Sequence, residues 1–296
     1  MTKRGWILFI ALGLLWGMPY LLIRIAVGAI DPLVVAGART LIGALLLLPV
    51  ALGRNELAAG FRKWRWLLAY TLIEINVPWL LLGHAETRLN SSTAGLLIAV
   101  VPLFAALIVT KLGHERLEAR RVLGLGIGFA GVALLVGIDI HFSDLMAVAA
   151  IMVVALCYAV GPIIIDRKLR DVPAIGVVTA SLMVATLAYA PFAPLLWPEH
   201  VPASAAWSVA GLGVLCTAAA FLVFFALIAE VGPARATVIT YVNPAVAFVL
   251  GAAVLSEPLT LGMAIGFPLV IVGSVLGTSR TRRHVQSEFV PRAGDT

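Results

Sequence analysis

Residues 91–117 read SSTAGLLIAVVPLFAALIVTKLGHERL, and residues 233–259 read PARATVITYVNPAVAFVLGAAVLSEPL. A shift of 142 residues aligns the two stretches without a gap. It pairs identical residues within and beyond them, namely Ala94 with Ala236, Val100 with Val242, Pro102 with Pro244, Ala105 with Ala247, Glu115 with Glu257, Leu117 with Leu259, Gly124 with Gly266 and Gly131 with Gly273. The chain therefore contains a faint internal duplication.

The composition is that of a membrane protein: 61% of the residues are hydrophobic, 12% are charged, and the mean hydropathy is +1.05. The apolar residues form runs of about 20, the length with which a helix crosses the hydrocarbon layer. There are ten such runs, at about 6–27, 32–52, 64–83, 91–110, 121–138, 144–165, 173–196, 207–229, 234–254 and 260–277. Continuous apolar runs favour helices over the alternating strands of a β-barrel.

Each half of the chain holds five runs, and an odd number makes the second half enter the membrane in the opposite orientation to the first. The sequence thus predicts an all-α integral membrane protein with ten transmembrane helices, arranged as two inverted five-helix repeats. We expect one transmembrane domain over residues 1–280, with repeat one at 5–138 and repeat two at 144–279. Residues 281–296 are predicted to be a disordered cytoplasmic tail. Inverted repeats are typical of transporters.

The distribution of Lys and Arg predicts the orientation. Of the 21 such residues, 18 fall in one alternating set of loops and termini, whereas the opposite loops hold only Arg88. Because positive charges are retained in the cytoplasm, both termini are expected there, in a multi-pass plasma-membrane protein. The pI of about 9.7 then needs no nucleic-acid partner, since basic loops lie beside anionic lipid headgroups.

Charged residues at membrane depth are functional candidates because burying them is costly. Arg39 and Glu74 lie at similar depths in successive helices, so an ion pair between them is one hypothesis. Alternatively, Arg39 caps the carbonyl groups of a broken helix, and Glu74 is a protonated, hydrogen-bonded core residue. Arg24 lies nearer a helix end and is expected to reach the interface.

Pro102 and Pro244 occupy equivalent positions in the two repeats, and proline removes a helical hydrogen bond. They predict matching kinks or hinges in the fourth and ninth helices, although membrane helices also tolerate proline in general. Glu115 and Glu257 follow these prolines by equal spacings. Each is expected to cap the helix that comes next in the chain rather than to gate substrate.

Small residues suggest how the helices pack. The spacing of Gly124 and Gly128 permits close helix contact, within the molecule or at a dimer seam. Cys157 and Cys216 lie within helices and are interpreted as packing residues. We expect a monomer or a weak homodimer.

Aromatic residues within helices, together with a few polar groups, predict a site for small amphipathic molecules. For any single aromatic residue the alternative is plain packing. The predicted substrate-binding residues are Trp16, Tyr20, Arg39, Glu74, Asn76, Trp79, His84, Tyr158, Phe221, Phe224, Tyr241 and Asn243. Five other tryptophans are placed to anchor the protein at the membrane interfaces, namely Trp6, Trp64, Trp66, Trp197 and Trp207.

Several motifs resemble the drug/metabolite transporter superfamily, specifically its ten-helix EamA-type members. They are Leu15-Trp16-Gly17-Met18-Pro19-Tyr20, Arg39, Ser91-Ser92-Thr93-Ala94 through Pro102 to His114-Glu115-Arg116-Leu117, and Gly232-Pro233-Ala234-Arg235-Ala236 through Asn243-Pro244 to Ser256-Glu257-Pro258-Leu259. The second repeat departs from the pattern with Tyr158-Ala159 in place of Trp-Gly. The resemblance implies that the two repeats surround a central cavity, which is exposed alternately to each side, with the fifth and tenth helices peripheral. It is most similar to bacterial inner-membrane exporters of amino acids, including aromatic ones, and related metabolites.

The leading functional hypothesis is therefore alternating-access export of small organic solutes, with a passive facilitator or channel of the same fold as the alternative. The chain has no His-Glu-x-x-His, Gly-x-Ser-x-Gly or Walker A sequence and no metal-spaced Cys/His cluster. We accordingly expect no enzymatic activity, cofactor, metal site or autonomous ATP-driven pumping.

Overall fold

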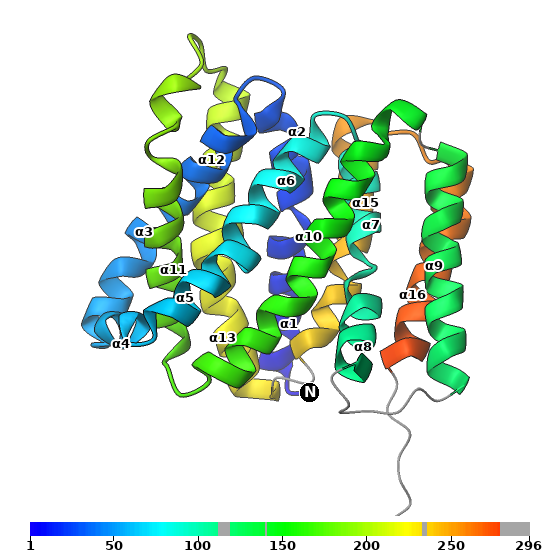
Figure 1. Cartoon of the computed structure of the whole chain (residues 1–296). Helices are drawn as coiled ribbons and strands as arrows, with labels where there is room; N and C mark the ends of the chain where they lie inside the picture. The colour runs from blue at the N-terminus through cyan, green and yellow to red at the C-terminus, as the bar shows by residue number, and fades with distance from the viewer. Residues whose placement is uncertain (112–118, 140, 233–235, 279–296) are drawn as a thin grey trace, which may run out of the picture.

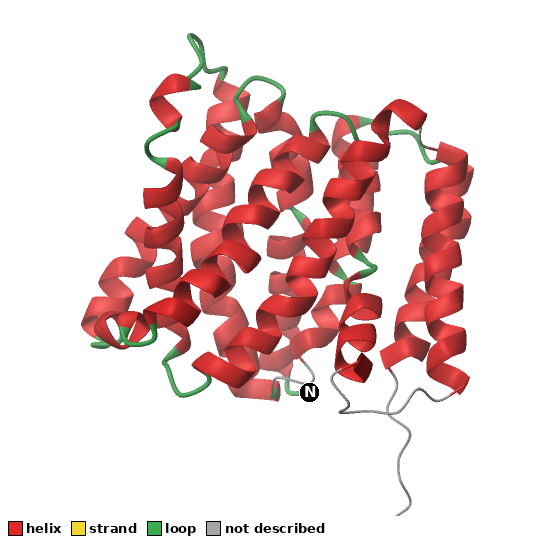
Figure 2. Cartoon of the chain, in the orientation of Figure 1, coloured by secondary structure: helices red, strands yellow, loops and turns green. Residues whose placement is uncertain are grey.

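A computed structural model describes residues 1–111, 119–139, 141–232 and 236–278, and within these ranges the chain is built from helices and loops without strands (Figure 2). Its α-helices are α1 (Lys3–Gly17), α2 (Pro19–Val27), α3 (Pro32–Gly53), α4 (Leu57–Phe61), α5 (Trp64–Tyr70), α6 (Val77–Glu86), α7 (Ser91–Ile98), α8 (Val101–Lys111), α9 (Ala119–Asp139), α10 (Leu145–Ile164), α11 (Ala174–Tyr189), α12 (Ala203–Gly213), α13 (Ala220–Val231), α15 (Asn243–Leu255) and α16 (Leu261–Thr278). Glu115 and the predicted tail lie outside the described residues.

Short helices of other types connect or interrupt these segments. The π-helical segments are η1 (Thr71–Asn76), η3 (Ile165–Leu169) and η5 (Val214–Ala219). The 3-10 helices are η2 (Phe142–Asp144), η4 (Ala193–Leu195) and η6 (Thr237–Tyr241).

The described helices match the expectation of a membrane protein. Six helical segments are long and apolar enough to cross a membrane, namely Lys3–Val27, Pro32–Gly53, Trp64–Glu86, Ser91–Lys111, Phe142–Leu169 and Ala203–Val231. Four shorter apolar helices fall on the remaining predicted runs, at Val122–Ile138, Ala174–Tyr189, Ile239–Leu255 and Leu261–Gly277. The all-α membrane fold is confirmed, and the count of ten crossings stays a prediction.

Local signals explain where several helices begin and end. The Thr2 side chain accepts a hydrogen bond from the Gly5 amide at 3.0 Å at the start of α1. Asp31 does the same for Leu33 at 2.8 Å, with Pro32 in the first turn of α3. Helix α11 ends at Tyr189 because Pro191 and Pro194 follow, so the predicted run to residue 196 was too long.

Both repeat-related prolines lie just after a break in a helix. The break between α7 and α8 falls at Ala99–Val100, before Pro102. The other falls at Val242, between η6 and α15, before Pro244. The predicted interruptions are confirmed, and their use as hinges stays a prediction. The π-helical η1 and η5 likewise occupy nearly equivalent positions in the two halves.

Helices α9 and α16 pack closely against each other at one end of the row of helices (Figure 1). A methyl group added at Gly124 would lie 2.8 Å from the carbonyl oxygen of Gly273. An added methyl group at Gly273 would also approach the backbone of Gly128. The glycine spacing in α9 therefore serves packing within the molecule, the first of its two interpretations.

The helix ends define two faces. The N-terminus, α4 and the end of α16 lie at the bottom of Figure 1, which we call the N-terminal face. The loops that follow α2, α6 and α11 lie at the opposite face. All five tryptophans predicted as interfacial anchors are exposed, from 42% for Trp66 to 78% for Trp207.

Candidate functional site

Arg39 lies in the middle of α3 and is only 7% exposed. Its Nε donates a hydrogen bond to the Thr217 hydroxyl at 2.9 Å, and one terminal nitrogen reaches the Cys216 carbonyl at 3.5 Å. Both acceptors belong to η5. A π-helical turn leaves carbonyl groups without their usual partners, so Arg39 links the first half of the chain to a helix irregularity in the second. This is the predicted alternative in which Arg39 caps a broken helix.

Trp79 of α6 lies beneath the Arg39 guanidinium, whose carbon is 3.7 Å from the ring centroid. Such a contact favours a desolvated cation. Tyr158 packs against the same apolar cluster as Trp79. Nearby, the Tyr189 hydroxyl donates to the backbone carbonyl of Asn76, the last residue of η1, at 2.6 Å. Four of the predicted site residues, Arg39, Asn76, Trp79 and Tyr158, are therefore brought together.

Trp16 forms an aromatic group with α13. Its ring centroid lies 4.8 Å from that of Phe224 and 6.1 Å from that of Phe221. The neighbouring Gly17 allows α15 to approach, since an added methyl group would collide with Val246. In the Trp-Gly motif, the tryptophan therefore packs against α13 and the glycine makes space for α15. Phe221 also packs against the cluster that contains Trp79, so the aromatic group and the Arg39 region are continuous.

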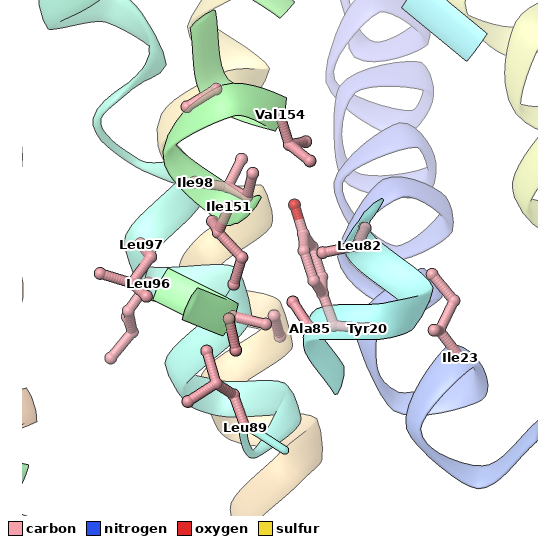
Figure 3. Close-up of a cluster of buried hydrophobic side chains, with 14 of the residues drawn as sticks. Tyr20, Ile23, Leu82, Ala85, Leu89, Leu96, Leu97, Ile98, Ile151 and Val154 are labelled. Carbon is pink, nitrogen blue, oxygen red and sulfur yellow. The ribbon is translucent and has the colours of Figure 1, made fainter. Parts of the chain in front are cut away.

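Tyr20 is in a more apolar setting than predicted. In Figure 3 its ring stands among side chains that include Leu82 and Ile151, and its hydroxyl points towards Val154. It is 6% exposed and belongs to the largest hydrophobic cluster. Tyr158 packs against this cluster too, so Tyr20 is a neighbour of the Arg39 region rather than part of its polar group.

The predicted ion pair between Arg39 and Glu74 is wrong. Among the described residues no carboxylate lies within ion-pair distance of Arg39. The Glu74 carboxyl group instead packs against Gly161 of α10, and its Oε2 atom has no hydrogen-bond partner there. Equal depth does not fix the direction of a side chain around its helix axis, and Glu74 faces a different neighbour from Arg39.

A second buried carboxylate, Glu86, was missed. It is 0% exposed at the end of α6, and neither carboxyl oxygen has a partner in the described part of the chain. Arg24 donates a hydrogen bond to its backbone carbonyl, and the reach of Arg24 to the membrane interface stays a prediction. The polar sequence Glu86-Thr87-Arg88 made this position look like an exposed loop, although α6 extends to it.

The remaining predicted site residues are dispersed. Asn243 begins α15, and its Oδ1 is buried with no partner among described atoms. Its backbone oxygen lies near Gly17, so it borders the aromatic group. The Tyr241 hydroxyl approaches the Ser274 carbonyl of α16 at 3.5 Å. His84 is exposed in the last turn of α6 and does not join the others.

Glu257 caps a helix, but not the one predicted. Its carboxylate accepts hydrogen bonds from the backbone amide and the hydroxyl of both Ser91 and Ser92, with both amides at 2.9 Å. It therefore caps α7 of the first half, not α16. Partial burial raises the pKa of Glu257, but the bonds from Ser92 and Ser91 outweigh this and hold it below its usual value.

The N-terminal face has its own contact between the halves. Asp171 forms ion pairs with Arg62, at 3.0 Å, and with Lys63. The hydrogen bond from Lys63 is the main reason that the pKa of Asp171 lies below its usual value. Lys63 also donates to the Lys168 carbonyl at 2.9 Å. Residues before α5 and after η3 are thereby joined.

Two cavities lie at the two faces. A cavity of about 660 Å³ at the opposite face is lined by Arg24, Ile25, Val27, Gly28, Thr87, Asn90, Leu255, Ser256, Glu257 and Pro258. A cavity of about 320 Å³ at the N-terminal face is lined by Arg62, Lys63, Trp64, Arg65, Trp66, Arg167 and Lys168. Neither cavity is lined by a predicted substrate-binding residue.

The sequence model of the EamA-like transporter family matches the chain twice, over residues 3–137 and 145–278. The chain belongs to this family. The relationship is carried by both halves, in agreement with the duplication seen in the sequence. It makes the protein a membrane transporter by family, as the sequence motifs indicated.

Relatives cover nearly the whole chain. The uncharacterized transporter YvbV of Bacillus subtilis is 28% identical over 290 residues, covering 94% of this chain and 93% of its own. The uncharacterized inner membrane transporter YedA of Escherichia coli K12 is 27% identical over 274 residues, covering 90% and 88%. A solved crystal structure matches with a TM-score of 0.66 at 21% identity, covering 94% of this chain and 97% of that one. These findings support a multi-pass inner-membrane transporter with the EamA fold.

Proposed function

We propose that this transporter exports small zwitterionic solutes, amino acids including aromatic ones, from the cytoplasm by alternating access. The proposal depends above all on the Arg39 guanidinium, which is buried, shared between the two halves of the chain, and without a carboxylate partner among the described residues. A buried charge costs roughly 2.5–3.5 kcal/mol in a membrane helix. A substrate carboxylate that binds it would offset this cost.

The hydrogen bonds that Arg39 makes leave some of its N–H donors for such a ligand. A guanidinium has five N–H donors, and Arg39 uses its Nε on Thr217 and one terminal nitrogen on Cys216. The remaining donors suit a carboxylate, which binds guanidinium through two parallel hydrogen bonds. Trp79 holds the guanidinium from below, so that its planar group is oriented in advance.

The rest of the site supplies the complementary chemistry of an amino acid. Trp16, Phe221 and Phe224 form an aromatic group next to the Arg39 region, suited to an apolar or aromatic side chain. The unpartnered carboxyl oxygens of Glu74 and Glu86 suit an ammonium group. A buried acid without a partner is a candidate functional group in a membrane protein.

Alternating access is supported by paired contacts between the halves at both faces. Glu257 joins Ser91 and Ser92 at the opposite face, and Asp171 joins Arg62 and Lys63 at the N-terminal face. In our proposal the packed arrangement is an occluded state, and breaking either set of contacts opens one side. The interruptions before Pro102 and Pro244 would act as the hinges.

The orientation of the transporter in the membrane is inferred from the Lys and Arg distribution. The basic loops lie at the N-terminal face, which we place in the cytoplasm together with both termini. Inverted repeats of five helices each would then line the transport path. We favour facilitated or weakly coupled transport, because an exporter can act down its substrate gradient.

Counterflow in liposomes tests this function. Purified protein is reconstituted with one unlabelled amino acid inside, and uptake of the labelled form is followed for a panel of amino acids. Uptake accelerated by internal substrate would support a carrier, with aromatic amino acids expected among the best substrates. Flux without acceleration would instead indicate a passive facilitator or channel. If no amino acid is taken up, with or without unlabelled substrate inside the liposomes, the proposed substrate class would be contradicted.

A further inference from the structure

A pocket at the N-terminal face has an unusual concentration of positive charge. We call it the basic pocket, and its seven lining residues are Arg62, Lys63, Trp64, Arg65, Trp66, Arg167 and Lys168. Five of them are cations and two are tryptophans. The first five precede or begin α5 in the first half of the chain, and the last two belong to η3 in the second half. An occupant of the basic pocket would therefore contact both halves.

One carboxylate next to the basic pocket holds two of its cations. Asp171 pairs with Arg62 and Lys63, so a single negative charge is shared between two positive ones. Lys168 and Arg65 lie over the rings of Trp66 and Trp64, at 4.8 Å and 5.4 Å from the centroids. Aromatic faces hold cations in place without cancelling their charge. The basic pocket is accordingly suited to an anion.

An exposed apolar stripe leads away from the basic pocket. Trp64, Leu68 and Leu72 are spaced four residues apart along α5 and η1, and they are 54%, 43% and 56% exposed. Residues at this spacing lie on one side of a helix. The stripe is about 12 Å long at ~1.5 Å per residue, comparable with the depth of one leaflet of a ~30 Å hydrocarbon core. It faces outward where a lipid chain would lie.

We propose that the basic pocket binds the phosphate-bearing headgroup of an anionic phospholipid, with one acyl chain along Trp64, Leu68 and Leu72. The cations alone would suit any phosphate compound. The adjoining stripe favours a lipid, because only a lipid joins a phosphate to a long apolar chain. Bound there, the lipid bridges the two halves next to the Asp171 contacts. This inference does not depend on the transported substrate.

Lipid binding by native mass spectrometry tests the proposal on the full-length protein in detergent. Phosphatidylglycerol, phosphatidylcholine and soluble glycerol phosphate are compared as probes. The pocket variant is Arg65→Gln/Lys168→Gln, and the matched control is Arg54→Gln/Lys111→Gln, which removes two exposed cations from the ends of α3 and α8. All proteins must show the wild-type apparent Tm without added lipid, and a pocket variant that fails this check is replaced by the single variant Lys168→Gln.

We expect wild-type protein to bind phosphatidylglycerol more tightly than phosphatidylcholine, with little effect of glycerol phosphate. Each cation near an anionic headgroup contributes roughly a factor of five. The double pocket variant should thus bind phosphatidylglycerol on the order of twentyfold more weakly, and the control should bind it nearly as wild type does. Equal losses in both double variants, or equal binding by the single variant and wild type, would overturn the proposal in favour of unspecific surface charge. Full displacement of the lipid by glycerol phosphate would overturn the assignment to a lipid.

Discussion

Gly131 and Gly266 face each other across the contact between α9 and α16, and the relationship is reciprocal. A methyl group added at either glycine would lie 2.7 Å from the carbonyl oxygen of the other. Gly124 and Gly273 form the same kind of pair, at 2.8 Å and 2.6 Å. The shift of 142 residues that relates the repeats maps Gly124 onto Gly266 and Gly131 onto Gly273, so it converts one pair into the other. A twofold relation between antiparallel helices has this property, which supports our proposal that the repeats are inverted.

This packing predicts a strong effect of side-chain size. Gly131→Leu should lower the free energy of unfolding by about 1–3 kcal/mol or more, as overpacking typically does. The reason is that a side chain at this position meets the backbone of α16. The matched control is Gly126→Leu on the same helix, where an added side chain meets nothing within 4 Å. The apparent Tm in detergent measures both. Equal Tm values for the two variants would contradict the packing account.

Orientation is tested by labelling single cysteines with an impermeant thiol reagent in intact cells, in a background without Cys157 and Cys216. Cysteines that replace Asn55, Arg170 and Ser287 should be protected, because the excess of Lys and Arg places these positions in the cytoplasm. Cysteines that replace Asn90, His141 and Glu199 should react. Labelling of both sets to the same extent would exclude ten crossings with both termini inside.

The cap formed by Glu257 predicts a pH dependence of stability. Its pKa is lowered in the folded protein, so its contribution is present above the unfolded pKa of about 4.3. The contribution is lost as the pH falls from roughly 5 through the lower folded value. Ser91→Ala/Ser92→Ala should cost about 1 kcal/mol at neutral pH and reduce this acid-dependent loss. A variant whose Tm falls with acid as steeply as that of wild type would argue against the cap.

Glu74 and Glu86 are the two candidates for coupling transport to protons. We expect wild-type flux in liposomes to depend only weakly on an imposed pH gradient, and flux through Glu74→Gln not to depend on it. The exposed Glu199 gives the control variant Glu199→Gln. If Glu74→Gln kept the full response to the gradient, Glu74 would not be the coupling carboxyl, and Glu86→Gln would become the decisive variant.

The fold was largely predictable because each membrane-spanning helix needs a long apolar run, and the backbone must satisfy its own hydrogen bonds. Pro102 and Pro244 marked helix interruptions because proline lacks the backbone N–H group that donates a helical hydrogen bond. The end of α11 was misjudged because hydrophobicity continues to Trp197, past the prolines that stop the helix.

Contacts across the chain were harder to predict. Depth in the membrane suggested that Arg39 meets Glu74, but depth leaves the rotation of each helix open, and Arg39 faces Thr217 instead. Glu257 was assigned to the helix next in sequence, whereas it caps α7, which is distant in sequence and near in space. Such contacts depend on how the helices are positioned and rotated relative to one another, which the sequence pattern does not specify.

The most direct test of the account compares a substrate with its analogue that lacks a carboxylate, in Arg39 variants. Counterflow by wild-type protein should discriminate strongly between phenylalanine and phenethylamine. Arg39→Gln should lower phenylalanine exchange roughly hundredfold, since truncating one partner of a buried charge pair costs about 2–5 kcal/mol, and it should abolish the discrimination. The control Arg54→Gln, at the exposed end of α3, should behave as wild type. If Arg39→Gln still discriminated between the two compounds as wild type does, Arg39 would not bind the substrate carboxylate, and the central claim would be contradicted.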